Sequence, residues 1–343
     1  MEKFIVNRDD SIYQAWPDLV RTDKDELICI FTECVHHSDR SQSRLALCRS
    51  NDRGRTWSER TYLTEAGSNA CYYNNARISK LRDGSLVILC DLCKNGDDGH
   101  CSTVHLWRGD PDGSVWEGPH PTPAKGIVPD KFLELENGRC IIACHTKSPK
   151  TGKLVQNLWY CDNGEWSEKI TVADDPRYNL CEASILPCPD GTLVCFMREN
   201  SFLGYDCFKA VSHDNGESWE GVYRAPIPGC HRPVSGFLNS GKVLLTYRFL
   251  QGGKGWLGSW TQNFFAALMD EKSAKETRRE EQSVRILPVD FDRSPVSDLG
   301  YSGWAQFDDG EIYIVNYIAD DAPNPHIRGY SLRESDFILE ADK

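Results

Sequence analysis

A phrase of two apolar segments joined by a short polar turn occurs six times along this 343-residue chain. Both arms of the phrase are rich in β-branched and aromatic residues, and four of the six turns contain Asp-Gly or Asn-Gly. These dipeptides supply the positive φ that tight hairpin turns require, so each phrase predicts a β-hairpin. Consecutive turns are 58, 54, 53, 50 and 69 residues apart, counted between the turn residues Glu26, Gly84, Gly138, Gly191, Gly241 and Gly310.

The spacing of these hairpins limits the fold class. Repeats of roughly 50 residues with several short strands, and almost no helical periodicity, are typical of β-propeller blades, whose ring closure leaves only short sheet edges. We therefore predict an all-β, six-bladed β-propeller that forms a single domain over residues 1–343. The longest step is explained by a charged insertion at about residues 270–285 in blade five. The apolar segment at Phe4 is expected to add the outer strand of the last blade and close the ring.

Composition excludes several classes of function. The 39 basic and 51 acidic residues give a net charge of −12, which disfavours a phosphate-binding surface, so we expect no nucleic-acid partner. No run of about 18 apolar residues occurs, and the N-terminal segment has neither the basic nor the apolar region of an export signal. We therefore expect no membrane partner and a cytoplasmic location.

The 15 cysteines are an odd number without an export signal, which predicts reduced thiols rather than a disulfide framework. Cys90 and Cys93, followed by His100, have a spacing that could hold zinc. Cys90 continues an apolar strand, however, so we expect no metal, and no other cofactor is indicated. Several cysteines fall in predicted strands as small core residues. Cys181 is expected to be the most accessible thiol near the mouth of the ring.

A second repeated motif lies between the hairpins. Residues 50–57 and 212–219 both fit the pattern S-x-D-x-G-x-[ST]-W. The Asp and Ser side chains can satisfy backbone amides of a tight turn, the Gly can take positive φ, and the Trp can pack between strands. With these motifs the chain resembles the sialidase (neuraminidase) superfamily, whose hallmark is this Asp-box. The resemblance implies a six-bladed propeller with Asp-box turns and a sugar site on the axis, at the face opposite the Asp-boxes.

The repeat also indicates which residues surround the axis. The first strand of each propeller blade is innermost, so residues just before each phrase and just after its second strand should meet at one mouth. This mouth combines charges of both signs with aromatic residues, which suits a polar ligand that carries an anionic group. Its candidate substrate-binding residues are Arg198, Arg232, Arg248, Arg77, Trp16 and Asp18.

The resemblance assigns catalytic roles to part of this mouth. Glu182, Arg198 and Tyr301 look like the glutamate, one carboxylate-binding arginine and the tyrosine of sialidases. In that family the glutamate makes the tyrosine competent as a nucleophile, in a retaining scheme that departs from the usual carboxylate pair. Asp39, in the loop before the first Asp-box, best matches the general acid and base. The resemblance thus implies an exo-acting, sialidase-like glycoside hydrolase that removes sialic acid or a related acidic sugar from an oligosaccharide.

One arginine of the family pattern is absent. The Phe/Tyr-Arg-Ile-Pro motif that opens blade one in sialidases reads Gln14-Ala15-Trp16-Pro17 here, so Ala15 stands at the arginine position. Two alternatives therefore stay open. The first is a histidine-dependent glycosidase or polysaccharide lyase on uronate-containing glycans, in which His36 carries the proton. The second is a non-catalytic glycan-binding propeller. The sequence does not determine the oligomeric state.

Overall fold

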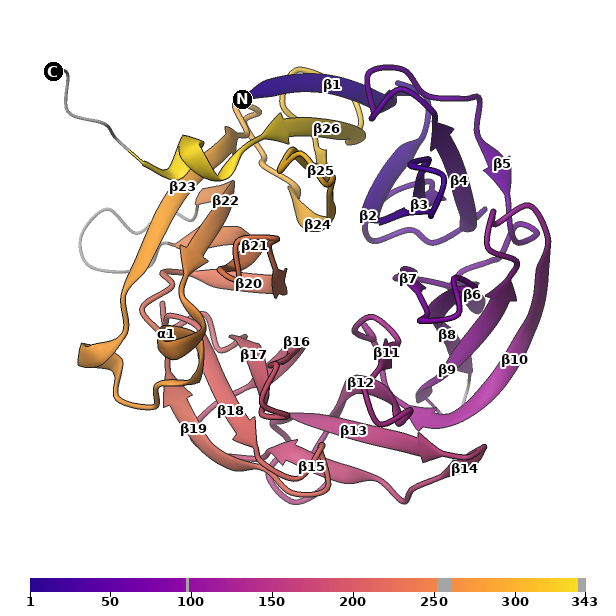
Figure 1. The fold of residues 1–343 in the computed structure, drawn as a ribbon. Helices are drawn as coiled ribbons and strands as arrows, with labels where there is room; N and C mark the ends of the chain where they lie inside the picture. The colour runs from indigo at the N-terminus through magenta and orange to yellow at the C-terminus, as the bar shows by residue number, and fades with distance from the viewer. Residues whose placement is uncertain (97–98, 252–260, 339–343) are drawn as a thin grey trace, which may run out of the picture.

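The computed structural model describes residues 1–96, 99–251 and 261–338, which form six antiparallel sheets arranged in a ring (Figure 1). Each sheet is one blade, whose first strand lies nearest the axis and whose last strand lies at the rim. The all-β, six-bladed propeller predicted from the hairpin repeat is thereby confirmed. No helix among the described residues has the length and apolar character that a membrane span requires.

The strands follow one another outward within each blade. Blades one to three contain β2 Tyr13–Arg21, β3 Leu27–Cys34, β4 Arg44–Ser50 and β5 Thr61–Tyr62; β6 Cys71–Tyr73, β7 Arg77–Lys80, β8 Leu86–Gly96, β9 Gly99–Gly109 and β10 Trp116–Lys125; and β11 Leu133–Glu134, β12 Cys140–Lys147, β13 Leu154–Asp162, β14 Glu165–Trp166 and β15 Ile170–Ala173. Blades four to six contain β16 Leu180–Pro187, β17 Leu193–Glu199, β18 Phe208–Ser212 and β19 Glu220–Arg224; β20 Cys230–Phe237, β21 Val243–Gln251, β22 Thr261–Met269 and β23 Val284–Phe291; and β24 Leu299–Gln306, β25 Ile312–Ile318, β26 His326–Leu332 and β1 Glu2–Asn7.

The N-terminal strand closes the ring. β1 pairs antiparallel with β26 of the last blade, with Phe4 opposite Gly329 (Figure 1). Both ends of the chain therefore contribute to blade six, which confirms the role expected for the apolar segment at Phe4. β1 covers the outer edge of β26 with main-chain hydrogen bonds, which tie the last blade to the segment that leads into the first.

Apolar side chains fill the spaces between neighbouring blades. The buried hydrophobic residues of the described ranges form six clusters, each of which joins two adjacent blades, and the cluster between blades six and one also includes Val128 from the segment before β11. One cluster, for example, combines Ile30 of blade one with Ile78 and Ile88 of blade two. Because both faces of each blade are covered in this way, the inner strands are held at set positions around the axis, and so are the loops that extend from them.

The two Asp-boxes form the turns between the third and fourth strands of blades one and four. In the first, the Asp52 carboxylate accepts a hydrogen bond from the Thr56 amide at 2.9 Å. Gly54 takes a φ of 80°, and a Cβ at this position would lie 2.2 Å from the Tyr313 ring, so only glycine fits. Asp214 makes the equivalent bond to the amide of Ser218 at 2.9 Å. The motif is thus a local turn device, as its residue pattern predicts.

The charged stretch expected at about residues 270–285 lies between β22 and β23 of blade five. It contains the short helix α1 Glu271–Lys275 and the 3-10 turn η1 Arg279–Glu281, and a second 3-10 turn, η2 Glu334–Phe337, follows β26. Lys209 of β18 donates hydrogen bonds to the carbonyls of Ser273 and Ala274 at 3.1 and 2.7 Å. The ammonium group of Lys209 therefore attaches the insertion to blade four.

All 15 cysteines are free, and most are buried among the strands. Cys181 is 1% exposed, so the prediction that it is an accessible thiol is wrong. It lies in the β16–β17 ladder opposite Arg198, where neighbouring strands cover it. Burial raises the pKa of its thiol well above the ordinary value.

Four innermost strands are irregular where they reach the mouth. The β2–β3, β16–β17, β20–β21 and β24–β25 ladders each shift register within the first residues of the inner strand. At the shifts, φ is 54° for Trp16, 46° for Glu182, 51° for Arg232 and 107° for Gly300. A bulge of this kind re-aims a side chain, and positive φ costs a non-glycine residue about 1–3 kcal/mol. Three such residues at one end of the axis indicate a functional site there.

Candidate active site

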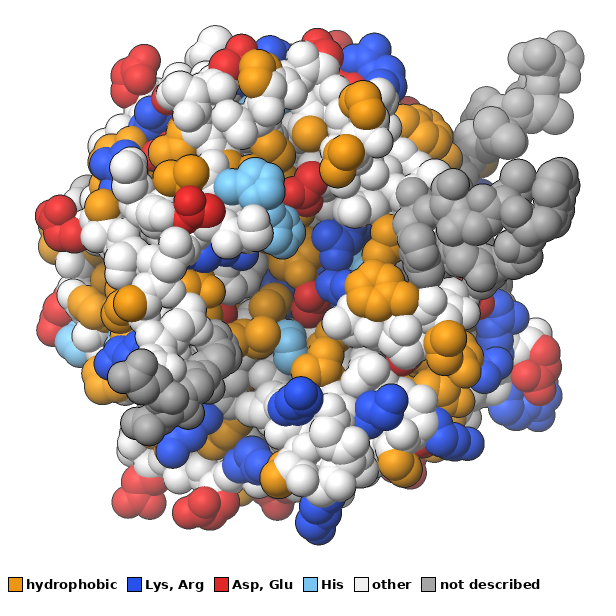
Figure 2. Space-filling view, turned by 180° about the vertical axis from the view of Figure 1, so that it is seen from behind, with side chains coloured by type: hydrophobic (Ala, Val, Ile, Leu, Met, Phe, Trp, Pro, Cys, Tyr) orange, Lys and Arg blue, Asp and Glu red, His pale blue; other side chains and the backbone are white. Residues whose placement is uncertain are grey.

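The face seen from behind Figure 1 is hollowed at its centre, and basic, acidic and histidine side chains gather around the hollow (Figure 2). Four predicted site residues meet on the inner strands of blades four to six. They are Glu182 on β16, Arg198 on β17, Arg248 on β21 and Tyr301 on β24, and we call them the central site. The repeated blade geometry explains their convergence, because each lies at the mouth end of the first or second strand of its blade.

Tyr301 and Glu182 are in direct contact, although 119 residues separate them. The Tyr301 hydroxyl donates a hydrogen bond to Oε1 of Glu182 at 2.5 Å, and Arg198 Nη1 donates to the same oxygen at 2.7 Å. The two residues of the pair are 8% and 6% exposed. Oε2 of Glu182 is buried and accepts no hydrogen bond from any described residue. One carboxylate oxygen is thus engaged with the phenol, and the other remains open to a ligand.

Arg248 is buried without an anionic partner. It is 6% exposed, and its guanidinium group makes no hydrogen bond or ion pair within the described part of the chain. Its central carbon lies 5.2 Å from the centre of the Tyr301 ring, and Arg198 leaves its own Nε without an acceptor. A buried unpaired charge is costly, and buried polar atoms normally have partners. This cluster of unpartnered donors is therefore arranged for an anionic ligand.

Arg198 and Arg248 occupy equivalent places in successive blades. Arg198 pairs with the residue before the bulge at Glu182, and Arg248 pairs with the residue before the bulge at Arg232. Arg232 itself is directed toward blades four and three, where its Nη1 donates to the carbonyl of Ala183 at 3.5 Å and its Nη2 to the carbonyl of Pro129 at 2.8 Å. Its guanidinium carbon lies 5.7 Å from the centre of the Tyr301 ring. The bulges of blades four and five, with the strands paired to them, thus place Arg198, Arg232 and Arg248 around Tyr301.

These charges set the protonation states of the pair. Burial disfavours ionisation of Glu182, but Arg198 and Arg248 outweigh burial and hold the pKa of this carboxyl below its ordinary value. Burial, and then the charge of Glu182, raise the pKa of Tyr301 above its ordinary value. The resting site therefore contains a neutral phenol hydrogen-bonded to a carboxylate.

Two buried histidines lie against the central site. Nδ1 of His145 accepts a hydrogen bond from the Glu182 amide at 3.3 Å, and burial lowers the pKa of His145 to about 4. Burial, followed by the charges of Arg198 and Arg248, holds the pKa of His231 well below its ordinary value. Both imidazoles are therefore neutral near pH 7. A cavity of about 430 Å³ adjoins His145 and extends between blades two and three.

Trp16 of blade one and Tyr317 of blade six form a buried aromatic wall beside the mouth. Trp16 lies with its ring centre 6.2 Å from that of Tyr317, which in turn lies 6.3 Å from that of Tyr301. The guanidinium carbon of Arg40 lies 3.8 Å from the centre of the Trp16 ring. Trp16 thus reaches Tyr301 only through two successive ring contacts, and its role in substrate binding stays a prediction.

Asp39 and His36 belong to the loop between β3 and β4 and make no contact with the central site within the described residues. The Asp39 carboxylate accepts hydrogen bonds from the Ser41 amide at 3.0 Å and from the side chain of Asn69 at 2.9 Å. Hydrogen bonds from Ser41 hold the pKa of Asp39 below its ordinary value. His36 Nδ1 lies 2.9 Å from the Ser38 hydroxyl. Both side chains are therefore engaged in shaping the loop.

Asp18 and Arg77 lie one step further along the axis. They are 0% and 2% exposed, and Arg77 Nε lies 3.4 Å from Oδ2 of Asp18. Lys131 approaches the other oxygen of Asp18 at 3.3 Å, and Arg77 Nη1 donates to the Ser302 carbonyl at 2.9 Å. The two predicted substrate-binding residues thus bind each other and the backbone instead of facing the hollow.

Sequence reasoning missed a second polar group at the mouth. The Asp298 carboxylate accepts hydrogen bonds from the hydroxyls of Tyr13 at 2.6 Å and Tyr317 at 2.8 Å, and lies 3.1 Å from Nδ1 of His37. No motif marks Asp298, because its partners come from blade one and from the next strand. It does lie immediately before the last hairpin phrase, which is the position that selected the other mouth residues.

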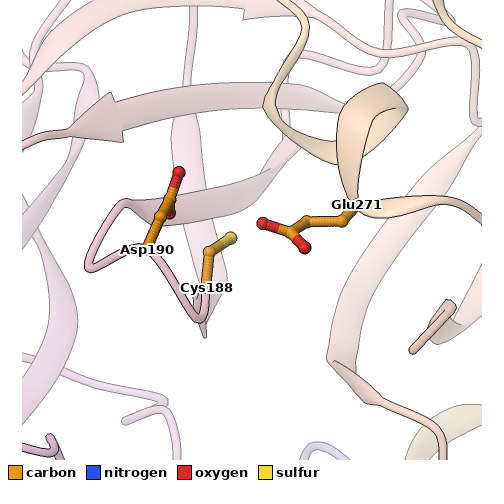
Figure 3. A group of neighbouring side chains, drawn as sticks. All are labelled: Cys188, Asp190 and Glu271. Atoms are coloured by element: carbon orange, nitrogen blue, oxygen red, sulfur yellow. The ribbon is translucent and has the colours of Figure 1, made fainter.

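Among the described residues, one group of side chains has metal-like spacing. Possible ligand atoms of Cys188, Asp190 and Glu271 lie within 4.8 Å of one another (Figure 3). The ammonium of Lys275 bridges the two carboxylates, at 2.8 Å from Asp190 and 2.7 Å from Glu271, and burial raises the pKa of Cys188 to about 12. This group therefore acts as an ion pair that fastens α1 to the β16–β17 turn. In the C-x2-C segment Cys90 and Cys93 are buried, and the side chain of His100 lies outside the described residues.

A charged cavity of about 480 Å³ lies between β1 and β23 at the rim. Asp290 is bonded there to Arg328 at 2.9 Å and to the Tyr330 hydroxyl at 2.8 Å. Asp320 is bonded to Arg293 at 2.6 Å and to Arg328 at 3.0 Å. Because these charges are satisfied by one another, this cavity lacks the unpartnered groups that mark the central site.

Comparison with known proteins agrees with this geometry. The family model described as BNR repeat-like domain matches residues 67–257. A sialidase from Paraclostridium sordellii is 23% identical over 197 residues, which are 47% of this chain and 48% of that relative. The chain thus spans about half the length of the curated relative that it matches.

Solved structures extend the likeness to nearly the whole chain. A protein of unknown function from Dyadobacter fermentans has a TM-score of 0.82 at 19% identity, and the match covers 97% of this chain and 98% of that one. A Hadza microbial sialidase has a TM-score of 0.68 at 14% identity, covering 95% of this chain and 66% of the other. At these identities, the structural matches establish the shared propeller fold.

Proposed function

Because this chain belongs to the BNR repeat-like domain family and is a distant homologue of sialidases, we propose that it is a glycoside hydrolase that removes a terminal acidic sugar from an oligosaccharide. The observation that carries the proposal is the buried hydrogen bond from Tyr301 to Glu182, with the unpaired Arg248 beside it. A glycan substrate is otherwise suggested only by analogy with the relatives.

Tyr301 is the proposed nucleophile. Its oxygen attacks the anomeric carbon while its proton passes to Oε1 of Glu182 over the existing 2.5 Å hydrogen bond. A neutral phenol does not repel a substrate carboxylate, and the resulting glycosyl-enzyme intermediate is then hydrolysed by water. Two displacements at one carbon retain its configuration.

Arg248 and Arg198 are the proposed anchors of the substrate carboxylate. Arg248 has its whole guanidinium available, and Arg198 has Nε available while Nη1 is bonded to Glu182. Ala15 removes the blade-one arginine of the sialidase pattern, so the clamp relies on residues of blades four and five. A planar guanidinium binds a carboxylate through paired hydrogen bonds, which suits sialic acid or another sugar acid.

Substrate binding would also activate the pair. The same two arginines lower the pKa of Glu182 in the resting site, after the opposing effect of burial. A bound carboxylate would partly neutralise them, so the basicity of Glu182 would rise when substrate is present. The proton of Tyr301 would then be accepted more readily with the anionic sugar in place than without it.

Aryl glycosides of sialic acid, glucuronic acid and galactose test the proposal. Wild-type protein is expected to hydrolyse an acidic glycoside and not the neutral galactoside, and Tyr301→Phe and Glu182→Gln are expected to lower kcat/KM by about 10³-fold. Tyr313→Phe is the matched control, because this buried tyrosine of the same blade bonds to Gly54 at an Asp-box. NMR of the first product is expected to show retained configuration.

Three results would contradict the proposal. Full activity of Tyr301→Phe would exclude the nucleophile, and an unsaturated, ultraviolet-absorbing product would identify a lyase on uronate-containing glycans. Binding of acidic oligosaccharides without turnover across the panel would identify a non-catalytic glycan-binding propeller.

A further inference from the structure

We propose that His37, oriented by Asp298, is the general acid and base of this site, an inference that rests on the proposed hydrolase function. Cleavage of a glycosidic bond to an alcohol needs a proton donor for the leaving oxygen, and the central site itself offers none. Its phenol is the nucleophile, its carboxylate receives the phenol proton, and its arginines do not exchange protons near neutral pH.

The geometry around His37 orients its imidazole. Nδ1 lies 3.1 Å from Oδ2 of Asp298 and 2.9 Å from the Tyr13 hydroxyl oxygen. The hydrogen of that hydroxyl is directed to Asp298, at 2.6 Å, so Tyr13 also presents an acceptor to Nδ1. Two acceptors at Nδ1 place a proton there and leave Nε2 as the nitrogen that gains and loses a proton. No described residue hydrogen-bonds to Nε2 of His37.

Asp298 is itself firmly positioned. Tyr317 donates to its Oδ1 at 2.8 Å, and the carboxyl group is 21% exposed whereas the His37 side chain is 48% exposed. Burial opposes ionisation of Asp298, but the hydrogen bonds from His37, Tyr13 and Tyr317 hold its pKa below the ordinary value. The carboxylate is therefore a fixed acceptor, and the half-exposed imidazole above it is free to meet a substrate.

His37 and Tyr301 flank the same aromatic wall. The His37 ring centre lies 5.4 Å from that of Trp16, and the rings of Trp16 and Tyr301 both lie beside Tyr317, at 6.2 and 6.3 Å. Trp16 and Tyr317 are buried and lie between the two groups, whereas His37 is half-exposed. In this proposal a sugar with its anomeric carbon at Tyr301 directs its leaving oxygen toward His37. The wall thus connects the nucleophile to the proposed proton donor.

Other groups near His37 do not fit the role. His36 is turned into its loop by Ser38, and Asp39 is held by Ser41 and Asn69, as described above. Arg40 is the nearby cation and is stacked on Trp16, and a guanidinium group does not serve as the proton donor for this step. The charged and titratable groups that face His37 are therefore Asp298, Tyr13, Tyr317, His36 and Arg40.

The two chemical steps balance with these groups. In the first, Nε2 of protonated His37 gives its proton to the glycosidic oxygen as the C–O bond breaks, and Tyr301 bonds to the anomeric carbon as its proton passes to Glu182. In the second, neutral His37 takes a proton from water as the water oxygen bonds to that carbon. The bond to Tyr301 then breaks, and Tyr301 recovers its proton from Glu182. His37 ends protonated, as it began.

Leaving-group dependence separates this proposal from the hydrolase function itself. A nitrophenolate leaves without protonation, whereas a sugar alcohol does not. For the acidic sugar that the wild type accepts, His37→Gln is expected to keep kcat/KM for the nitrophenyl glycoside within about threefold and to lower kcat/KM for the oligosaccharide by about 10²–10⁴-fold. In the wild type, kcat/KM for the oligosaccharide should decrease on the alkaline side of the pH profile. In His37→Gln this decrease should be absent. His213→Gln, at an exposed histidine of the second Asp-box, is the control.

Equal losses on both substrates for His37→Gln, or an unaltered pH profile, would overturn the proposal. A selective loss on the oligosaccharide in Asp39→Asn instead would assign the role to Asp39. Tyr301→Phe should lose both substrates, so its failure to do so would refute the hydrolase function and not this step. Nitrogen-15 NMR adds a readout that needs no activity. Neutral His37 should carry its proton on Nδ1 in wild type and shift to the Nε2 tautomer in Asp298→Asn, and an Nε2 proton in wild type would refute the positioning role of Asp298.

Discussion

Arg77 and Arg248 are both buried near the axis of the ring, but their surroundings differ. Arg77 donates to the Ser302 carbonyl at 2.9 Å and lies 3.4 Å from Asp18, which Lys131 also approaches. Arg248 has no acceptor among the described residues and faces the ring of Tyr301 at 5.2 Å. Arg77 thus has a carboxylate beside it, although its Nε and Nη2 have no hydrogen-bond acceptor among the described residues, whereas Arg248 has no carboxylate within ion-pair distance there.

The network of charges around Asp18 supports the ring. Asp18 of β2 accepts a hydrogen bond from the Ile78 amide of β7 at 2.9 Å, and Asp130 accepts one from the Ile185 amide of β16 at 2.7 Å. Each carboxylate therefore joins the inner strands of two neighbouring blades. The comparison teaches that burial of a charge at the axis does not by itself mark a binding residue. What differs is the carboxylate in contact, which Arg77 has and Arg248 lacks among the described residues.

The largest expected effect is on stability, from Arg77→Met. Removing one member of a buried ionic network leaves the carboxylate of Asp18 with less compensation, so the free energy of unfolding should fall by about 3 kcal/mol. Urea unfolding measures this change, and kcat/KM of the folded protein should remain near the wild-type value. An unaltered unfolding free energy would show that the network does not support the ring.

Arg248→Met is the matched change at the arginine that has no carboxylate partner among the described residues. A charge-assisted hydrogen bond contributes about 1.5–3 kcal/mol, so kcat/KM for the acidic substrate should fall by about 100-fold. Stability should change less than in Arg77→Met, because the variant removes a buried charge without an ion pair but also the attraction of that charge to Glu182. Steady-state kinetics and thermal unfolding test both halves. A destabilised variant with unchanged kcat/KM would reverse the comparison.

Acidic pH should lower the free energy of unfolding, because His145 is buried in its neutral form. Its pKa is about 4 in the folded protein, against an ordinary value of 6.5, so the unfolded chain takes up the proton first as pH falls. The stability contributed by neutral His145 is complete above pH 6.5 and is lost progressively as pH falls toward 4. At pH 5 the loss should be about 2 kcal/mol. His145→Gln should flatten this part of the unfolding profile, and an equally steep profile would contradict the assignment.

The smallest effects are expected at the Asp-boxes, on the face opposite the mouth. Asp52→Ala and Asp214→Ala each remove the acceptor of a turn amide, so each should lower the free energy of unfolding by about 1 kcal/mol. The two losses should add in the double variant, because the sites lie in different blades. Activity should not change. A selective loss of activity in either variant would mean that the Asp-box face takes part in function.

Much of the site could be predicted because it follows the repeat. Glu182, Arg198, Arg248 and Tyr301 stand at the ends of inner strands, and a regular ring brings such positions together. The bulges could not be predicted, since no residue pattern marks the positive φ of Glu182. The burial of Cys181 beside it depends on that same irregular segment.

Other parts of the mouth depend on contacts that have no local signature. Asp298 meets His37 across 261 residues, and its burial between two tyrosines appears only when blades one and six are adjacent. Likewise, Asp18 and Arg77 stand at positions that the hairpin repeat assigns to the mouth. Their side chains contact each other and are buried, so they do not line the hollow. The cytoplasmic location expected from the lack of an export signal stays a prediction.

The sequence by itself determined the number of blades, the Asp-box turns and the strand that closes the ring. These features rest on turn chemistry and on strand patterns within a few residues of one another, so they can be recognised locally. Only the tertiary structure decided which buried charges are paired and which are open. That distinction depends on distances between side chains from different blades, because a charge at the axis is satisfied or left unpaired by residues more than 50 positions away in the chain.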